Sequence, residues 1–587
     1  MDKGKIGLEV YSTYFKKYYF IYKKEVLTLL LIVLGTILLQ LWTPQLLKNF
    51  IDSAKSEASL YSLTKLAILF IVTSLIIQVL AIISTFIGES LGWKATNELR
   101  ADIIKHCLLL DISFHKKNKS SELVERVDGD TTQLSNFFSQ FIVSMIGNFL
   151  LIIGILIVMY NEDPLIGASL TIFLILSTLS ILKIRNFAVP FWIKVREVRT
   201  EFFGSTAELL EGVEVLKAND STNYALQTYS HKFKKWLPIR LKAQLGSITL
   251  WMSILFIFTL GNAIAFAICS YLWSKGSISL GTVYMIFFYT ELLRQPIEQI
   301  RVQITNLQSA DASLKRINEL FDIKNDIIIK PKDSIEEDLP EVVFKNVYFK
   351  YENNKVILRN IDFQLAKGNT LAIIGESGSG KTTISKLIMR LYEPYQGEIF
   401  LRGKNISSYD LTDLRRNISF VSQDVELFNT TVRNNITLFN SKITDETVLN
   451  LINSFGMKDH YDNLSNGLDT IIKEKGKNLS AGEAQMLIMC RALLKESEIF
   501  ILDEASSRLD SLTDKIIQGK FAKYLKGKTV ITITHRLQTI KDADYIMILS
   551  HGNIKEFGSR EKLLKDSHSM YYEIVNTKRL GVTNNGG

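Results

Sequence analysis

The residues with the clearest chemical meaning form a glycine-rich turn between a strand-like run at 371–374 and a helical run. The turn reads Gly375-Glu376-Ser377-Gly378-Ser379-Gly380-Lys381-Thr382, with Thr383 directly after it. This is the complete G-x-x-x-x-G-K-S/T spacing of a phosphate-binding loop, whose backbone N–H groups and helix N-terminus surround phosphates. Lys381 is expected to reach the β and γ phosphates, and the Thr382 hydroxyl to ligate Mg²⁺. The pattern predicts a nucleotide site.

A second chemical signal lies far along the chain, where the apolar run Ile499–Leu502 ends in Asp503 and Glu504. One carboxylate there can hold a metal ion while the next polarises a water molecule. Apolar strands often end in acids, so this pair carries little weight alone. Together with the phosphate loop it predicts in-line attack of water on the γ-phosphate, with Glu504 as general base or water-positioning group.

These features make the segment resemble the nucleotide-binding domain of an ATP-binding cassette (ABC) transporter, and the resemblance covers essentially the whole soluble part of the chain. The family carries a signature, L-S-G-G-Q, that completes the ATP site of a partner chain. The similar stretch here departs from it at two positions, and it reads Leu479, Ser480, Ala481, Gly482 and Glu483. The resemblance implies ATP and Mg²⁺ as ligands and a second cassette as partner.

The resemblance assigns four further motifs. Gln423 stands where the family's Q-loop glutamine ligates Mg²⁺ and senses the membrane domain, and His535 where the switch histidine contacts the γ-phosphate. Tyr351 has the position of the adenine-stacking aromatic, and the D-loop is similar to Ser507, Arg508, Leu509 and Asp510. A single histidine or tyrosine is usually structural. Their occurrence in the family's order favours the functional interpretation.

The composition indicates two unlike halves. Of the 587 residues 22% are charged, yet the mean hydropathy is +0.13 because long apolar runs crowd the part before about residue 300. The net charge of +9 does not predict nucleic-acid binding, since many basic residues flank apolar runs as at the cytoplasmic ends of membrane helices. Three distant cysteines form no disulfide or metal pattern.

Six apolar stretches approach the length of a membrane span. They run roughly Val26–Trp42, Leu66–Ile87, Phe141–Tyr160, Leu165–Leu182, Ile248–Trp273 and Leu280–Leu293. An even number and a lysine-rich N-terminus without a secretory signal place both termini in the cytoplasm. The long loops 88–140 and 183–247 then lie on the cytoplasmic side, and their helical periodicity predicts helices that extend far past the bilayer.

The expected fold is an all-α membrane domain of six helices followed by an α/β phosphate-loop ATPase domain. We expect the membrane domain at 1–325, a charged linker at 326–340 and the ABC nucleotide-binding domain at 341–580. The membrane part resembles the family's exporters, which place a short coupling helix at the tip of each long loop. The matching residues here are Asp111–His115 and Glu211–Lys217.

Three other functions fit less well. An ATP-gated channel needs a pore signature that we do not find, a DNA-repair ATPase lacks membrane spans, and importers usually keep the two domains on separate chains. The sequence therefore predicts a multi-pass subunit of an ATP-driven exporter in the cell membrane. It does not distinguish small molecules, lipids and peptides as substrates.

Charges near the spans are few, and they are Glu89, Glu291 and Arg294. Ionisable residues inside a membrane often serve function, but these three fall close enough to span ends that we expect them to lie in water.

The altered signature bears on the partner. Ala481 adds a methyl group where backbone must approach phosphate, and Glu483 adds negative charge near the ligand. This favours a heterodimer, in which another half-transporter supplies an intact signature, over a homodimer that tolerates both changes.

Glu504→Gln should preserve ATP affinity and lower the hydrolysis rate by at least about a hundredfold, the scale of losing a general base. Lys381→Ala should instead weaken ATP binding itself, because it removes a phosphate contact. An ATP-binding titration beside a phosphate-release assay separates the two effects. Near-normal turnover in Glu504→Gln would remove that residue from the chemistry.

Overall fold

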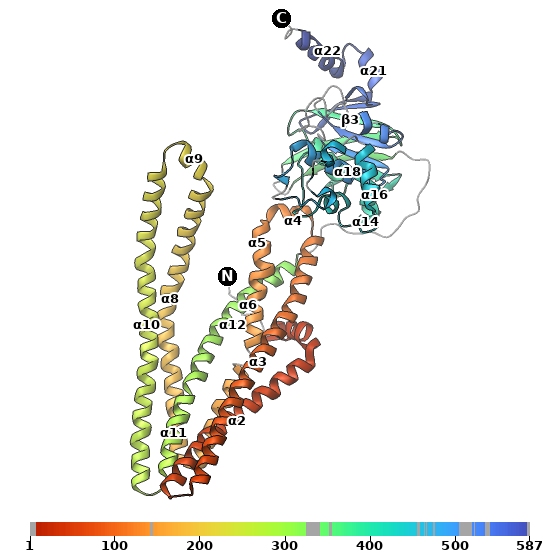
Figure 1. Ribbon diagram of the computed structural model, residues 1–587. Helices are drawn as coiled ribbons and strands as arrows, with labels where there is room; N and C mark the ends of the chain where they lie inside the picture. The colour runs from red at the N-terminus through yellow and green to blue at the C-terminus, as the bar shows by residue number, and fades with distance from the viewer. Residues whose placement is uncertain are drawn as a thin grey trace. The chain divides into compact units, whose positions relative to one another are not determined.

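A computed structural model of the chain separates into two compact units (Figure 1). It describes residues 8–140, 145–323, 341–351, 355–454, 458–462, 464, 466–473, 476–503, 519–521, 523–534 and 540–583. The membrane unit comprises 1–108 and 120–323, and the nucleotide unit comprises 109–119 and 324–587. The tip of the first long loop therefore clusters with the soluble part of the chain.

The membrane unit is all helical in its described residues. Its elements are α1 (Leu8–Tyr14), η1 (Phe15–Tyr19), η2 (Phe20–Tyr22), α2 (Lys23–Lys55), α3 (Leu60–Leu109), α5 (Ser120–Val124), η3 (Glu125–Asp130), α6 (Thr131–Gln140), α7 (Gly147–Glu162), α8 (Pro164–Glu211), α9 (Val213–Ala218), α10 (Thr222–Ser274), α11 (Leu280–Leu292) and α12 (Arg294–Phe321). Apart from its first and last turns, a helix pairs its backbone N–H and C=O groups within itself, as a lipid environment requires.

Among the residues that the structure describes, four helical segments are long and apolar enough to cross a membrane by length and composition: Val10–Lys55, Leu60–Leu109, Pro164–Ile181 and Thr222–Ser274. The helix Gly147–Glu162 is apolar but shorter. The third and sixth predicted spans coincide with this helix and with α11 as far as the structure describes them. The number of six spans remains a prediction.

Long helices run into both predicted loops, as the periodicity indicated, and their extension past a bilayer stays a prediction. Helices α3, α8 and α10 contain 50, 48 and 53 residues, which corresponds to about 72–80 Å at 1.5 Å per residue. A hydrocarbon layer of about 30 Å accounts for less than half of that length. Helices α8 and α10 run side by side with the six-residue α9 at their tip (Figure 1). The other loop ends in α4 (Ile112–Lys117), so both tips carry a short helix.

Polar contacts fix the position of α11 at its first turn. Ser279 caps the helix by accepting from Thr282 N at 3.0 Å. Asp52 of α2 accepts from Ser279 Oγ at 2.5 Å and from Gly281 N at 2.9 Å. A Cβ atom at Gly281 would lie 2.4 Å from the carbonyl oxygen of Lys48, so the two helices meet there through backbone. These contacts lock α11 against α2.

Two sheets form the frame of the nucleotide unit. The first is antiparallel with the order β2-β1-β4-β5, and the second has the order β10-β9-β3-β8-β7-β6. In the second sheet β9, β3, β8, β7 and β6 are parallel neighbours. The strands are β1 (Val342–Lys350), β2 (Val356–Leu365), β3 (Thr370–Gly375), β4 (Gln396–Leu401), β5 (Lys404–Asn405), β6 (Ile418–Val421), β7 (Ile499–Asp503), β8 (Thr529–Ile533), β9 (Tyr545–Ser550) and β10 (Asn553–Ser559).

The parallel strands are apolar runs because both faces of their sheet are buried. Every residue of β8 is buried, and so are the middle residues of β3 and β9. The helices of this unit are α4, α13 (Lys381–Ile388), η5 (Ile406–Ser408), α14 (Leu411–Arg416), α15 (Val432–Thr437), α16 (Asp445–Ser454), α17 (Lys458–Asp462), η6 (Gly467–Asp469), α18 (Ala481–Leu493), α21 (Arg560–Lys565) and α22 (Met570–Thr583).

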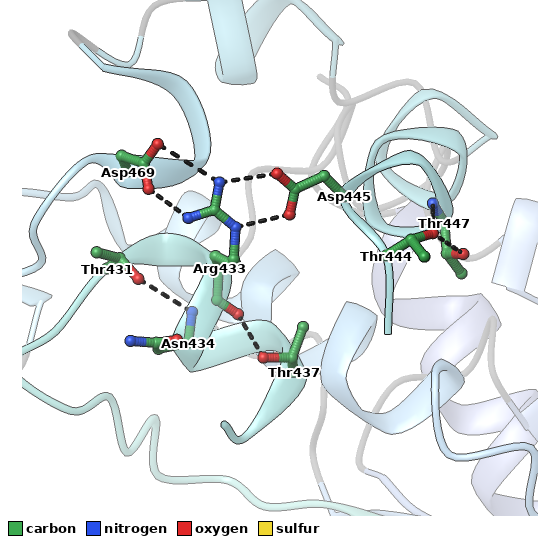
Figure 2. Close-up of polar contacts among 8 residues, drawn as sticks. All are labelled: Thr431, Arg433, Asn434, Thr437, Thr444, Asp445, Thr447 and Asp469. Carbon is green, nitrogen blue, oxygen red and sulfur yellow. Dashed lines mark hydrogen bonds and ion pairs between the residues drawn. The ribbon is translucent and has the colours of Figure 1, made fainter. Parts of the chain in front are cut away.

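An arginine ties together three helical segments between β6 and β7. Arg433 of α15 donates to both carboxylate oxygens of Asp445 at 2.6 and 2.8 Å, and it also bridges to Asp469 of η6 (Figure 2). Both side chains of the Arg433–Asp445 pair are exposed to solvent, which screens the charges and leaves each ion pair only weakly stabilising. The planar fork of Arg433 nevertheless sets how α15, α16 and η6 meet, which a lysine could not do.

Candidate functional site

Parallel pairing brings the predicted nucleotide residues to one edge of the sheet. Strands β3, β8, β7 and β6 are neighbours in that order, so their carboxyl ends lie at the same edge. Gly375 ends β3, Asp503 ends β7, and Gln423 follows β6 by two residues. Segments far apart in the sequence therefore contribute to one site.

The loop after β3 has the shape that a phosphate-binding turn requires. Gly380 directly precedes α13 with a φ of +106°, a conformation that favours glycine. A Cβ atom at Gly375 would lie 2.1 Å from the carbonyl oxygen of Leu549, so only glycine fits there. Ser379 is buried, and its Oγ has no hydrogen-bond partner among the described residues. The turn is therefore built around backbone groups, as a phosphate cradle must be.

Lys381 points back over this loop. Its ammonium donates to the carbonyl oxygens of Gly375 and Glu376, both at 2.8 Å, and the residue is buried. The side chain thus already reaches across the turn where phosphate oxygens are expected. Five residues after Lys381, burial and then the charge of Lys116 lower the pKa of Lys386. The carboxylate of Asp503 raises the pKa of Lys386. The charge of Lys386 is therefore disfavoured by burial and by Lys116 and favoured by Asp503.

Tyr351 lies beside the phosphate loop, as the adenine-stacking assignment requires. It follows β1, and its hydroxyl shares a hydrogen bond of 3.2 Å with Thr383 Oγ1 at the start of α13. Its ring packs edge-on against Phe349 and Tyr392, with centroid distances of 4.8 and 5.2 Å. The tyrosine is thus held by an aromatic cluster at the first turn of α13.

A lysine that sequence reasoning missed covers this cluster. The Lys116 ammonium, from α4, lies 5.3 Å from the centroid of the Tyr351 ring and 5.5 Å from that of Tyr392. Both distances are within the range of a cation–π interaction. Lys116 is close to Tyr351 although 235 positions separate them in the sequence, and no local sequence pattern predicts such a contact. A residue from the first loop tip therefore touches the candidate adenine position.

The signature segment begins α18 with a capping box. Ser480 Oγ accepts from the N–H of Glu483 at 3.2 Å, and the Glu483 carboxylate accepts from the N–H of Ser480 at 2.7 Å. The carboxylate thus satisfies the start of its own helix. The spacing S-x-x-E is the sequence signal for this arrangement. The folded-back carboxylate weakens the sequence argument that Glu483 repels a partner's ATP.

Another missed residue, Arg491, links α18 to the segment that follows Gln423. Its guanidinium donates to the carbonyl oxygens of Glu426 at 3.2 Å and of Asn435 at 2.9 Å. Burial lowers the pKa of Arg491. Gln423 itself is exposed, at the start of this segment. The arginine thereby joins the signature helix to the segment that carries the candidate Mg²⁺ ligand.

Six predicted site residues lie outside the described residues: Glu504, Ser507, Arg508, Leu509, Asp510 and His535. Their roles remain predictions. Among the described residues no cluster of three or more histidine, cysteine or acidic side chains could hold a metal ion. The oxygen donors of Thr382, Gln423 and Asp503 nevertheless fit Mg²⁺, which binds proteins through few side chains and keeps waters and phosphate oxygens as its other ligands.

Comparison with known proteins finds two family matches on the chain. Residues 26–297 match the ABC transporter transmembrane region, and residues 358–507 match the ABC transporter family. The second match contains the phosphate loop, the signature and both acids. The two matches lie on the chain in the order of the predicted membrane and nucleotide parts.

Relatives match over most of their length. The "ATP-dependent lipid A-core flippase" of Pasteurella multocida is 30% identical over 88% of this chain and 90% of its own. The protein of the same name from Syntrophus aciditrophicus is 32% identical over 84% and 81%. "Iron-sulfur clusters transporter ATM1, mitochondrial" of Kluyveromyces lactis is 29% identical over 94% and 79%.

A solved structure shares the fold. A bacterial Atm1-family ABC exporter with ATP bound superposes with a TM-score of 0.81, covering 95% of this chain and 98% of its own at 23% identity. The predicted fold class, a helical membrane domain followed by a nucleotide-binding domain, is therefore confirmed.

Lys116→Met should lower the KM for ATP by about two- to fivefold, because adenine would no longer compete with a cation worth about 0.5–1 kcal/mol for the Tyr351 ring. Steady-state ATPase assays in lipid nanodiscs measure the change. Lys117→Met, the next residue of α4, is the matched control and should leave the KM within twofold. An unchanged or higher KM in Lys116→Met would show that the lysine does not compete with adenine.

Proposed function

This chain belongs to the ABC transporter family as an ATPase-coupled exporter, and we propose that it moves its substrate out of the cytoplasm by alternating access as half of a dimer. The observation that carries the proposal is the single sheet edge at which the phosphate loop, Gln423 and Asp503 meet. When ATP binds at that edge, two nucleotide-binding domains would close on it, and the membrane helices would convert this movement into transport.

The proposed chemistry is hydrolysis of the γ-phosphate by in-line attack of water. Lys381 and the loop N–H groups would hold the phosphates, and Tyr351 would stack on the adenine. Glu504 would orient or deprotonate the water, and His535 would contact the γ-phosphate. Mg²⁺, held by Thr382 and Gln423 with Asp503 nearby, would neutralise developing charge on the phosphate oxygens.

We propose that the protein lies in the plasma membrane and crosses it six times. Both termini and the ATPase domain would then lie in the cytoplasm. Lysines before the first span support this orientation. We propose domain limits of 1–325, 326–340 for the linker and 341–580. Residues 109–119 are a special case, because they belong to the membrane domain by sequence and cluster with the nucleotide unit in space.

We propose a small molecule, lipid or peptide as substrate. The names of the relatives attach lipid A-core and iron–sulfur clusters to those proteins. The exposed apolar faces of α10 and α11 favour an apolar or amphipathic cargo.

Inside-out membrane vesicles test the direction of transport. ATP added outside should drive a lipophilic substrate into the lumen, because the ATPase domain faces the outside of such vesicles. The Lys381→Ala variant, which should not bind ATP tightly, is the control. ATP-driven loss of substrate from the lumen would contradict export.

For the partner we propose a second, different half-transporter that supplies an intact signature. The Ala481 methyl group at the signature supports this, because backbone must approach phosphate closely there. The charge of Glu483 adds less support, since its carboxylate accepts from Ser480 N.

The chain expressed alone tests this partner assignment. We expect weak ATP hydrolysis, and we expect Ala481→Gly with Glu483→Gln to raise it several-fold. The glutamine preserves the capping box, so the variant changes charge without losing the helix cap. A stable homodimer with substrate-stimulated hydrolysis that the double variant does not improve would contradict the heterodimer.

A further inference from the structure

One face of α11 carries a carboxylate among apolar side chains. Leu280, Tyr284 and Phe287 are 37%, 52% and 37% exposed, and with the exposed Glu291 they recur at the spacing of a single helix face. We call these four residues the α11 stripe. The opposite face, which includes Met285 and Tyr289, is buried.

Glu291 is the last residue but one of α11, and α12 begins three residues later at Arg294. It comes eleven residues after Leu280, where α11 begins, and Asn262 comes twelve residues before Ser274, where α10 ends. At 1.5 Å per residue both lie about 17 Å from those ends, which in the proposed six-span topology is near the middle of a hydrocarbon layer about 30 Å thick. This depth argues against the position in water at a span end that the sequence favoured. A carboxylate at such a depth faces a cavity or a binding partner rather than lipid.

The carboxylate has an amide as its partner. Asn262 Nδ2 donates to Glu291 Oε1 at 2.6 Å. Arg294, one turn further on, makes no ion pair with Glu291 in the described part of the membrane unit. Asn262 Oδ1 is buried and has no hydrogen-bond partner among the described residues. A neutral amide orients the carboxylate without cancelling its charge.

Two aromatic rings lie one helical turn from the Asn262–Glu291 pair. Phe266 and Phe287 stack with their centroids 5.3 Å apart, one helical turn from Asn262 and Glu291 respectively, and both rings are partly exposed. Aromatic faces attract cations. An apolar cavity of about 260 Å³ between α8, α10 and α11 is lined by Ile286 and Thr290 of the buried side of α11, so it is separate from the stripe.

We propose that Glu291, Phe266 and Phe287 form a binding site for an amphipathic organic cation, an inference that rests on the export function proposed above. The carboxylate and the ring faces bind the cationic group, and the α11 stripe receives the apolar body. Charge complementarity selects this occupant. An acyl chain or an apolar face of a second copy would cover the phenyl rings but leave a buried charge unpaired.

The test uses two hydrophobic ions of nearly equal shape and opposite charge, tetraphenylphosphonium and tetraphenylborate. Binding of each is measured to the full chain in lipid nanodiscs, with the signal of empty nanodiscs subtracted. We expect the wild type to bind the cation at least about tenfold more tightly than the anion, and Glu291→Gln to lose that preference. Glu208→Gln, at an exposed carboxylate of α8 outside the spans, is the matched control and should retain it.

Two further variants guard against a loss of fold. Glu291→Asp keeps the charge and should keep the cation preference, and Phe266→Leu should weaken cation binding more than anion binding. Equal binding of both ions by the wild type would overturn the site, and so would unchanged cation affinity in Glu291→Gln. A change of oligomeric state in Glu291→Gln with cation affinity intact would overturn it too, by assigning the stripe to a subunit contact.

Failure of the site and failure of the export function give different results. Wild-type nanodiscs that hydrolyse ATP but do not discriminate the two ions would refute the cation site alone. Discrimination between the ions, combined with vesicles that show no ATP-driven uptake, would refute export and leave a cation-binding site.

Discussion

The parallel pairing of β3, β8, β7 and β6 is the constraint on which the nucleotide unit depends. Ile533 of β8 lies opposite Ile373 on one side and Asp503 on the other, so the phosphate loop and the acid leave the sheet at the same level. Two strand spacings separate them, or about 10 Å. That distance leaves room for phosphates and a hydrated magnesium ion between the loop and the carboxylate. A register slip of one residue would turn Asp503 to the other face of the sheet.

Two basic residues connect this edge to other parts of the same unit. Lys116 brings the tip of the first long loop to the candidate adenine position, and Arg491 joins the signature helix to the segment after Gln423. In the membrane unit, Asp130 at the end of η3 accepts from Ser313 Oγ and from Arg316 Nε, both at 2.9 Å. These bonds tie the second half of the same loop to α12. Within each unit these contacts hold their end of the loop in place, and the proposed coupling of hydrolysis to transport requires such fixed points.

The site could be predicted wherever local sequence determines local shape. The phosphate loop needs glycines and a strand-to-helix turn, and β3 and α13 form where the residues indicated. Apolar runs likewise located β6 and β7, and unbroken periodicity located the long helices. Contacts between elements could not be predicted, because the rotation of one element against another leaves no local signal. Lys116 over Tyr351 and Asn262 against Glu291 are of this kind. Glu483 is different, because the S-x-x-E spacing predicts its capping role. The resemblance to the signature instead led to an argument from the charge of its carboxylate.

Coupling between the two units is the central claim of this account, and substrate-stimulated ATP hydrolysis measures it most directly. The purified chain in lipid nanodiscs, with its partner if one is required, would be assayed against a panel of lipophilic cations, neutral lipids and peptides. The account predicts that at least one class raises the hydrolysis rate saturably, and that Lys381→Ala abolishes both the basal and the stimulated rates. Hydrolysis that no substrate alters, in a preparation that binds the same substrates, would contradict it.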